Sequence, residues 1–348
     1  MKRWLVYTGF VPVIFIAFVS FVDVSSLPFL SADKRLFLSS LPWTNHRVSA
    51  LDPATLAPLA QLGKVVVVTG GNAGIGLETV RQLAEAGATV VMTSRSVAKG
   101  EEARQHLLDR TPSLDIRVLR LDLADLLSVK AFASAFAATD LKKVDALVLN
   151  AGTFARDQVL QTTDEFELMF GAHHVGHFFL FKILMPFMLR SDDPRLVVTS
   201  SALFARLASI DWTTLEDPVA AETNLGPSLL YAQSKLANVL FASEARRRFG
   251  ERIVVTVNHP GLVRTKILGE RSICENIPGF CFEPELGAAA NLLGCVGQAE
   301  AIQGRFVLPR GALADWGVDV PVVNETLAAE LWAWTEKAVS RKLKTRTQ

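Results

Sequence analysis

The sequence predicts an α/β protein built on a doubly wound parallel sheet of the Rossmann type, in a single domain that follows an N-terminal transmembrane helix. From residue 62 onward, short runs rich in apolar β-formers alternate with helical stretches, which is typical of repeated βαβ units. These runs are apolar at every position, so helices must cover both faces of the sheet. A glycine-rich turn follows the first run, as expected where a strand turns tightly into a helix. We expect strands over residues 65–69, 89–93, 116–121, 146–149, 196–199, 253–258 and 306–308.

An uncharged N-terminal run stands apart from this domain. Residues 4–22 carry no charged side chain and are rich in Phe, Val and Ile, which suits a helix that crosses the hydrocarbon core. A cleaved signal peptide is the alternative, but this run is longer than the apolar region of a usual signal peptide. We expect a single-pass membrane protein, in the endoplasmic reticulum if the organism is a eukaryote. The expected divisions are a membrane anchor over residues 1–23, a tether over 24–60, the α/β domain over 61–341 and a tail over 342–348.

The side of the membrane that the domain faces is left open. Lys2 and Arg3 favour a cytosolic N-terminus, whereas basic residues between 34 and 47 favour the opposite orientation. The triplet Asn324-Glu325-Thr326 is an acceptor for N-glycosylation and would report the side. The apolar stretch 178–189 is short for a second span, and we expect it to be a core helix.

Charge and cysteine content exclude other classes of protein. The chain has 36 basic and 35 acidic residues and no long block of like charge, so nucleic acid is not an expected partner. Cys274, Cys281 and Cys295 form neither a C-x-x-C pair nor a His/Cys metal spacing, and we interpret them as reduced thiols. A disulfide between Cys274 and Cys281 is the alternative if the domain faces an oxidising lumen.

The glycine-rich segment predicts a dinucleotide site. Glycines between a strand and a helix let the backbone approach a pyrophosphate, whose charge is stabilised at the helix N-terminus. The end of the next expected strand is the segment Thr93-Ser94-Arg95, and no Asp or Glu stands there. An acidic residue there selects NAD, whereas an arginine accommodates the 2'-phosphate of NADP, so NADP(H) is the expected cofactor. The residues of the turn that we expect to bind it are Gly70, Asn72, Gly74, Ile75 and Gly76.

Tyr231 and Lys235 predict acid/base chemistry. They are four residues apart in a helical pattern, so their side chains share one face. A nearby ammonium favours the phenolate and lowers the pKa of a tyrosine by up to about three units, which acid/base catalysis at neutral pH requires. The chain has only two tyrosines, and Tyr7 lies in the expected membrane helix. Tyr231 is therefore the expected proton donor and acceptor, with a purely packing role as the alternative.

These motifs resemble those of the short-chain dehydrogenase/reductase family, from about residue 62 to the C-terminal helix. The resemblance rests on Thr-Gly-x-x-x-Gly-Ile-Gly at 69–76, Asn-Ala-Gly at 150–152, a serine after the fifth strand and the Tyr-x-x-x-Lys pair. Segments 94–95, 99–101, 176–178, 234–241 and 259–265 resemble the retinol dehydrogenase-like branch, which commonly acts on lipophilic alcohols and carbonyls. The resemblance implies that Ser201 orients the substrate oxygen and that Lys235 also holds the nicotinamide ribose. It further implies cofactor contacts from Asp122 and Leu123 at the adenine, from Asn150, Ala151 and Gly152, and from Thr265 near the nicotinamide.

One position departs from the family's pattern. Where the family has an Asn that is thought to support a water in the proton relay, this chain has His173. The histidine would substitute for the Asn, impair the relay or replace it by titrating itself. His174 and His177 stand close by, but the spacing lacks the Glu of H-E-x-x-H and no carboxylate is near in sequence, so we expect no metal.

The expected function is NADP(H)-dependent interconversion of an alcohol and a carbonyl on a lipophilic substrate of retinoid, steroid or fatty-chain type. The alternative is a catalytically impaired NADP(H)-binding sensor or scaffold, which only the change at His173 supports. Expected partners are a membrane and a small lipophilic alcohol or carbonyl, and a homodimer is left open. The expected catalytic residues are Ser201, Tyr231, Lys235 and His173. Substrate contacts are expected from residues 202–228 and 266–284, with an apolar cleft formed by Phe204, Trp212, Ile267, Leu268, Phe280 and Phe282.

Overall fold

The computed structural model of the 348-residue chain describes residues 31–39, 41, 63–268, 274, 280–316 and 320–347. The expected membrane anchor over residues 1–23 lies outside the described residues, as does most of the expected tether.

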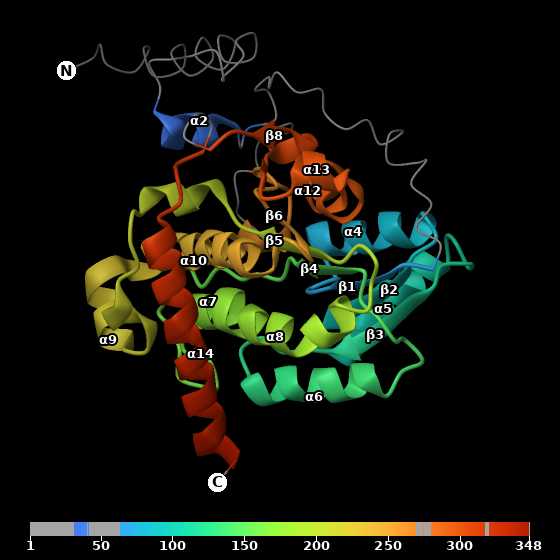
Figure 1. Ribbon diagram of the computed structural model, residues 1–348, viewed down its shortest axis with the longest axis horizontal. Helices are drawn as coiled ribbons and strands as arrows, with labels where there is room; N and C mark the ends of the chain where they lie inside the picture. The colour runs from blue at the N-terminus through green and yellow to red at the C-terminus, as the bar shows by residue number, and fades with distance from the viewer. Residues whose placement is uncertain are drawn as a thin grey trace, which may run out of the picture.

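In the described part of the chain, eight strands form one sheet in the order β3-β2-β1-β4-β5-β6-β7-β8 (Figure 1). The first seven strands along the chain are parallel, as predicted, and no end differs from its expected position by more than one residue. β8 pairs with β7 in the antiparallel direction, which the sequence did not predict because β8 has two residues. The strands are β1 (Val65–Val68), β2 (Thr89–Ser94), β3 (Ile116–Arg120), β4 (Ala146–Leu149), β5 (Arg195–Thr199), β6 (Val254–Asn258), β7 (Phe306–Val307) and β8 (Leu313–Ala314).

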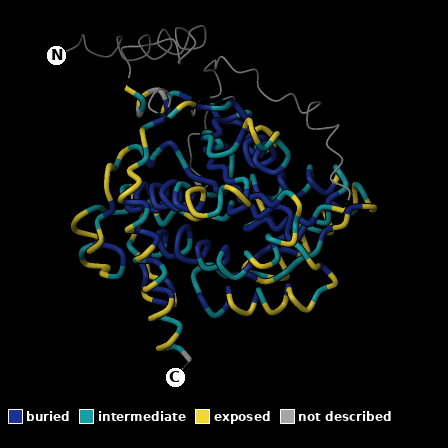
Figure 2. The backbone as a smooth tube through the Cα atoms, in the orientation of Figure 1, coloured by how far each residue is buried: buried dark blue, intermediate teal, exposed yellow. Residues whose placement is uncertain are grey.

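Helices cover both faces of this sheet, which explains why its strands are apolar throughout. Along β1, Val65 and Val67 pack into the core on one face, whereas Val66 and Val68 pack into the core on the other. The first face carries α6 (Leu126–Ala137), α8 (Gly176–Met188) and α10 (Gly226–Phe249), with α14 (Glu325–Thr347) packed on α10. The second face carries α4 (Gly74–Glu85), α5 (Val97–Leu108) and α12 (Pro284–Val296). α8 and α10 are mostly buried, whereas α6 and α14 expose one side (Figure 2).

Two helices bear on the expected boundaries. The continuous helix Leu168–Met188 is long and apolar enough to cross a membrane, but 67% of its most apolar stretch is buried within the fold, in keeping with a core helix. It consists of α7 (Leu168–Phe170), a π-helical turn η2 (Gly171–Val175) and α8. α14 continues through the segment expected to be a tail, where Lys342 and Arg346 pair with Glu165 at 2.9 Å and Asp164 at 2.8 Å.

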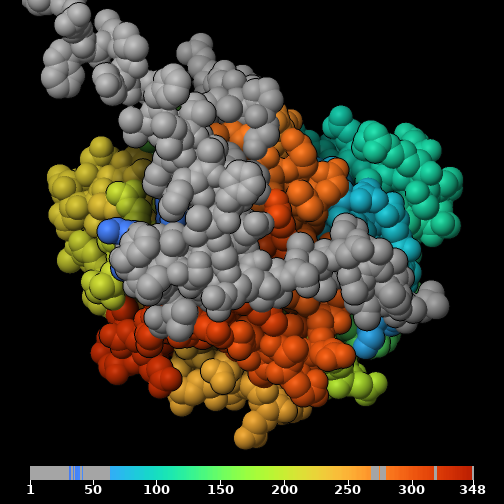
Figure 3. All heavy atoms as spheres, turned by 90° about the horizontal axis from the view of Figure 1, so that it is seen from above, coloured from blue at the N-terminus to red at the C-terminus, as the bar shows by residue number. Residues whose placement is uncertain are grey.

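The described part of the expected tether forms a helix, α2 (Ala32–Ser39), rather than irregular chain. Its Leu36 is fully buried in the core on the α10 face of the sheet. α2 packs on η3 (Ala202–Arg206), the short 3₁₀ helix that follows β5. Seen from above, the dark blue atoms of α2 lie at the surface beside yellow-green atoms (Figure 3).

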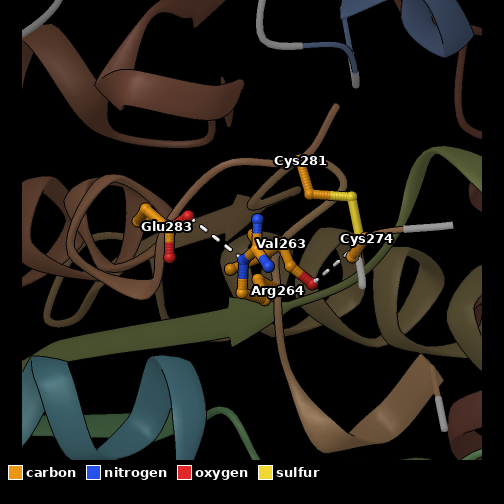
Figure 4. The surroundings of a disulfide bond; sticks show 5 residues. All are labelled: Val263, Arg264, Cys274, Cys281 and Glu283. Atoms are coloured by element: carbon orange, nitrogen blue, oxygen red, sulfur yellow. Dashed lines mark hydrogen bonds and ion pairs between the residues drawn. A yellow bond between two sulfur atoms is a disulfide. The ribbon is translucent and has the colours of Figure 1, made fainter. Parts of the chain in front are cut away.

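The interpretation of all three cysteines as reduced thiols is wrong for two of them. Cys274 and Cys281 form a disulfide (Figure 4), whereas Cys295 is a free, buried thiol. After β6 the chain folds back and pairs with itself through two backbone hydrogen bonds. The N–H of Phe282 donates to Leu262 O at 2.8 Å, and the N–H of Arg264 donates to Phe282 O at 2.9 Å. This return, which the cysteine spacing did not reveal, brings Cys281 next to Cys274.

Candidate active site

A hydrogen-bond network joins the carboxyl ends of β1 and β4, where the strand order reverses and open α/β sheets bind ligands. Thr69, directly after β1, accepts at Oγ1 the N–H groups of Asn150 and Ala151, both at 2.9 Å. Asn150 donates from Nδ2 to Thr69 O at 3.0 Å. These bonds hold the expected segment from Asn150 to Gly152 beside the glycine turn.

The glycine turn fits a pyrophosphate. Gly70 and Gly74 have φ angles of 63° and 54°, which side chains rarely adopt. A Cβ at Gly76 would lie 2.2 Å from Gly70 O, and one at Gly74 would lie 3.0 Å from Thr265 Cγ2. α4 begins without a side-chain cap on its first N–H groups, so these donors remain for an anion. The turn thus forms a backbone-lined cradle, and Thr265 stands next to it.

A pocket of about 380 Å³ lies beyond this turn at the end of β2. Arg95 is exposed there and forms no hydrogen bond or ion pair with any described residue. Lys99, which sequence reasoning did not assign to the cofactor, is a second exposed cation on the pocket wall. Asp122 also lines it, and its Oδ1 accepts the N–H of Ala124 at 3.0 Å. The other expected cofactor residues on this pocket are Gly70, Asn72, Leu123, Ala151 and Gly152.

Three of the four expected catalytic side chains, Ser201, Tyr231 and Lys235, meet between the end of β5 and the first turns of α10. The hydroxyl of Tyr231 is hydrogen-bonded to Ser201. Lys235 Nζ lies 5.6 Å from the centroid of the Tyr231 ring and donates to Thr199 O at 3.3 Å. Ser200 Oγ donates to Lys235 O at 2.8 Å, which ties this turn of α10 to the end of β5.

The expected fall in the pKa of Tyr231 is wrong for this structure. Burial raises the pKa of Tyr231 to about 12, and the hydrogen bond to Ser201 opposes this only in part. Burial also lowers the pKa of Lys235 to about 8. The sequence argument placed an ammonium beside the phenol at moderate dielectric. In the structure Lys235 is buried and donates to Thr199 O, and Tyr231 is half-buried at the cavity. At neutral pH the phenol is protonated and most of the lysine is charged.

His173 is buried with both ring nitrogens in use. Nε2 accepts the N–H of Thr153 at 2.8 Å, so Nδ1 carries the proton and donates to Ser234 Oγ at 2.8 Å. Ser234 donates in turn to Tyr231 O at 2.7 Å. Burial and the charge of Lys235 hold the pKa of His173 well below its ordinary value. The imidazole is therefore neutral near pH 7, which does not fit the role of a titrating relay.

The neighbouring histidines serve other contacts. His174 Nε2 lies 2.8 Å from Thr335 Oγ1, among aromatic rings of the core. His177 donates from Nδ1 to His173 O at 2.9 Å, and its Nε2 lies 2.9 Å from Thr69 Oγ1. The three rings therefore bind three different sets of partners.

An apolar cavity of about 380 Å³ opens in front of Ser201 and Tyr231. Of the expected cleft residues, Ile267 and Phe280 line it. Phe204 and Phe282 are buried in the fold, and Trp212 packs against Trp334, so the expectation for these three is wrong. Leu203, from the expected segment 202–228, also lines the cavity. Sequence reasoning missed the apolar residues Phe37, Leu41, Phe154, Leu262 and Val263 on the cavity wall, and also His259. The other expected site residues on the wall are Ile75, Asn150, Gly152, Lys235 and Thr265.

Comparison with known proteins agrees with this geometry. The family described as short chain dehydrogenase matches residues 64–209. A short-chain dehydrogenase/reductase of Armillaria gallica is 34% identical over 281 residues, which cover 79% of this chain and 89% of that protein. The chain belongs to the short-chain dehydrogenase/reductase family. Human retinol dehydrogenase 11 is 34% identical to this short-chain dehydrogenase/reductase over 279 residues, covering 78% of this chain and 84% of that protein.

Solved structures share the fold of this short-chain dehydrogenase/reductase. An uncharacterised protein of Mycobacterium paratuberculosis superposes with a TM-score of 0.64 at 30% identity, covering 84% of this chain and 98% of that one. An Escherichia coli CFT073 protein complexed with NADPH has a TM-score of 0.59 at 21% identity, covering 71% and 97%. The family and the site agree on an oxidoreductase that acts on alcohols or carbonyls with a nicotinamide cofactor.

Proposed function

We propose that this short-chain dehydrogenase/reductase uses NADP(H) to interconvert an alcohol and a carbonyl on a lipophilic substrate. The observation that carries the proposal is the meeting of Ser201, Tyr231 and Lys235 on one apolar cavity. Gly152 lines both that cavity and the pocket at the end of β2. A dinucleotide that spans the two would bring its reactive end to Tyr231.

The adenosine end supports NADP(H) over NAD(H). Arg95 and Lys99 offer two exposed cations at the pocket, and no carboxylate follows β2 to bind a ribose 2'-hydroxyl. Charge-assisted hydrogen bonds to a 2'-phosphate are worth about 1.5–3 kcal/mol. The E. coli structural relative complexed with NADPH agrees with this preference.

The cavity residues account for the proton and the oxygen of the reaction. The cofactor supplies a hydride to the carbonyl carbon when bound. Ser201 and Tyr231 bind the carbonyl oxygen, and Tyr231 transfers its phenolic proton to that oxygen as negative charge develops. The Lys235 ammonium stabilises the resulting phenolate. One hydride and one proton convert the carbonyl into the alcohol, and the reverse sequence oxidises the alcohol.

The protonation states favour reduction near neutral pH. Tyr231 already holds the proton that reduction consumes, because burial raises its pKa to about 12. Oxidation needs the phenolate, which is scarce at pH 7. His173 is a positioning residue in this scheme, since its hydrogen bonds reach the Tyr231 backbone through Ser234 and its ring packs edge-on against the Tyr231 ring at 5.8 Å between centroids.

The substrate class and the location rest on further support. The cavity wall is mostly aliphatic and aromatic, and the relatives include several named retinol dehydrogenase. These support a retinoid, steroid or fatty-chain substrate. The uncharged run over residues 4–22 supports a single-pass membrane anchor over residues 1–23, in the endoplasmic reticulum if the organism is a eukaryote.

The test is turnover by the purified full-length protein. NADPH oxidation is followed by absorbance with a panel of retinoid, steroid and fatty aldehydes and ketones, and NADP⁺ reduction is followed with the matching alcohols. We expect NADPH-dependent reduction of at least one lipophilic carbonyl. Tight NADPH binding without turnover of any member of the panel would instead favour the sensor or scaffold.

A further inference from the structure

The helix α2 lies outside the segment that matches the family, which begins at residue 64, yet it is docked on the catalytic domain. Leu36 is fully buried, and Ser39, which is 1% exposed, donates from Oγ to Leu36 O at 2.6 Å. α2 packs on η3, whose N-cap is Ser201. The helix therefore stands directly beside a residue that we assign to the substrate oxygen.

Phe37 lies on the wall of the catalytic cavity although it is 55% exposed. A large apolar side chain is costly to leave in water, and this one follows a residue that anchors the helix. Leu41 lines the same cavity, with Ile267 and Phe280 from the loop after β6. These apolar residues come from two segments that are far apart in the sequence. Ser201 and Tyr231 form the polar side of the same cavity.

We propose that α2 forms one wall of a subsite for the apolar part of the substrate, with Phe37 and Leu41 contacting the chain or ring that is remote from the reacting carbon. This inference rests on the proposed function. Burial of Phe37 against the substrate raises kcat/KM for long apolar substrates and leaves short ones unaffected, because only the long ones reach it. α2 thus determines specificity from outside the segment that carries the catalytic motifs.

The first test is the change in specificity of Phe37→Ala in the full-length protein. The ratio of kcat/KM for dodecanal to that for butanal should fall about tenfold, the lower end for a lost hydrophobic contact, with kcat/KM for butanal within about twofold of the unmodified value. Val219→Ala is the matched control, because Val219 is 70% exposed on α9 (Pro218–Ala220) and does not line the cavity. An unchanged ratio in Phe37→Ala overturns the inference.

The second test does not need turnover. A twelve-carbon alcohol with a terminal diazirine is photolysed with the full-length protein and NADP⁺, and labelled peptides are mapped by mass spectrometry. Label on residues 36–41 that excess dodecanol removes supports the subsite, even if the protein turns over no aldehyde and the proposed function fails. Turnover of dodecanal together with label that avoids α2 leaves the proposed function standing and overturns the inference.

A second, independent pair of observations concerns the compartment. Cys274 and Cys281 form a disulfide, and they are 1% and 5% exposed. Disulfides form and persist in oxidising compartments. Asn324-Glu325-Thr326 is the only Asn-x-Ser/Thr triplet of the chain. All three of its residues are exposed at the start of α14, where Asn324 Oδ1 accepts the N–H of Leu327 at 3.0 Å.

We infer that the catalytic domain faces an oxidising, glycosylating lumen and that Asn324 is a site of N-linked modification. The disulfide points to the oxidising side of a membrane, and the exposed triplet would be open to modification on that same side. Lys2 and Arg3 would then remain cytosolic, as the positive-inside rule favours for these two residues, whereas the basic residues between 34 and 47 would lie in the lumen against that rule.

The test uses the full-length protein in sealed microsomal vesicles from eukaryotic cells. Protease added outside should leave the domain intact until detergent opens the vesicles. Endoglycosidase should increase its mobility on a gel, and Asn324→Gln should remove that shift, with Asn276→Gln as the control outside any triplet. Digestion of the domain in sealed vesicles overturns the inference about the compartment, and protection without any glycan overturns the modification site alone.

Discussion

His173 Nδ1 donates a hydrogen bond to Ser234 Oγ at 2.8 Å, and this bond connects the substituted family position to the proposed acid/base residue. Ser234 Oγ donates in turn to the backbone carbonyl of Tyr231 at 2.7 Å. On its other side, His173 Nε2 holds the N–H of Thr153 in the loop that follows β4. A single neutral imidazole therefore braces the helix of the tyrosine against the loop that borders both pockets.

Loss of this brace should cost stability and turnover together. His173→Leu leaves the Thr153 N–H without its partner and deprives Ser234 of a donor, which should lower the free energy of unfolding by about 1–3 kcal/mol. His173→Asn, which restores the family's residue, should keep the rate similar or raise it. Denaturant unfolding and kcat, measured on both variants, check this. Because His173 is a positioning residue here, His173→Asn should leave the shape of the pH profile unchanged. A titration that is present in the unmodified protein and absent from this variant would contradict the assignment.

The strands could be predicted closely because their pattern needs only local information. Runs such as Val65 to Val68 are apolar at every position, since both faces are buried. β8 was not predicted because it has only two residues, Leu313 and Ala314, which form a strand only by pairing with β7. The helix α2 was not predicted because a helix of eight residues is stabilised by tertiary contacts, here the burial of Leu36, rather than by its own propensity.

The site was predictable as a set of residues but not in its electrostatics. The spacing of Tyr231 and Lys235 placed them on one helix face. Only the structure reveals the desolvation that raises the pKa of Tyr231, opposite to the expected shift, and lowers the pKa of Lys235. Phe204, Phe282 and Phe280 are equally apolar, so the sequence cannot tell which of them line the cavity. Tertiary packing places Phe204 and Phe282 in the core and Phe280 on the cavity wall.

Arg95 should decide the choice of cofactor. Arg95→Asp places a carboxylate where a 2'-phosphate would bind, so affinity for NADPH should fall tenfold or more while affinity for NADH is kept or improved. Arg110→Asp, the same change at an exposed arginine outside the pocket, should leave both affinities unchanged. Fluorescence titration with each cofactor measures this, and equal affinity of the unmodified protein for NADPH and NADH would refute the assignment.

Tyr231 and Lys235 should fail in different ways although they lie one helical turn apart. Tyr231→Phe keeps the ring that packs on Phe154 and removes the proton, so turnover should fall by about 10²–10⁴-fold while NADPH binding survives. Lys235→Met should reduce turnover and also weaken NADPH binding, because it loses the proposed ribose contact. Rapid-mixing kinetics and cofactor titration on both variants separate these outcomes. A Tyr231→Phe protein that retains a tenth of the unmodified rate would exclude the acid/base role.

Reduction of the carbonyl should lose activity as the pH rises and not as it falls. Burial lowers the pKa of Lys235 to about 8, so its ammonium is present below that pH and is lost above it. Tyr231, with its pKa raised to about 12, stays protonated across the range from pH 6 to 10. The pKa of His173 lies well below its ordinary value, so this ring remains neutral throughout.

A single titration should therefore appear between pH 6 and 10, with kcat/KM for reduction level below about pH 7.5 and declining about tenfold per unit well above the pKa of Lys235. The measurement is kcat/KM for the carbonyl at saturating NADPH, in buffers of constant ionic strength. Lys235→Arg, which keeps its charge at all these pH values, should flatten the decline even if its rate is lower. A loss of activity from pH 7.5 down to pH 6 would instead require a group that titrates as a free histidine does, and would return the proton relay to His173.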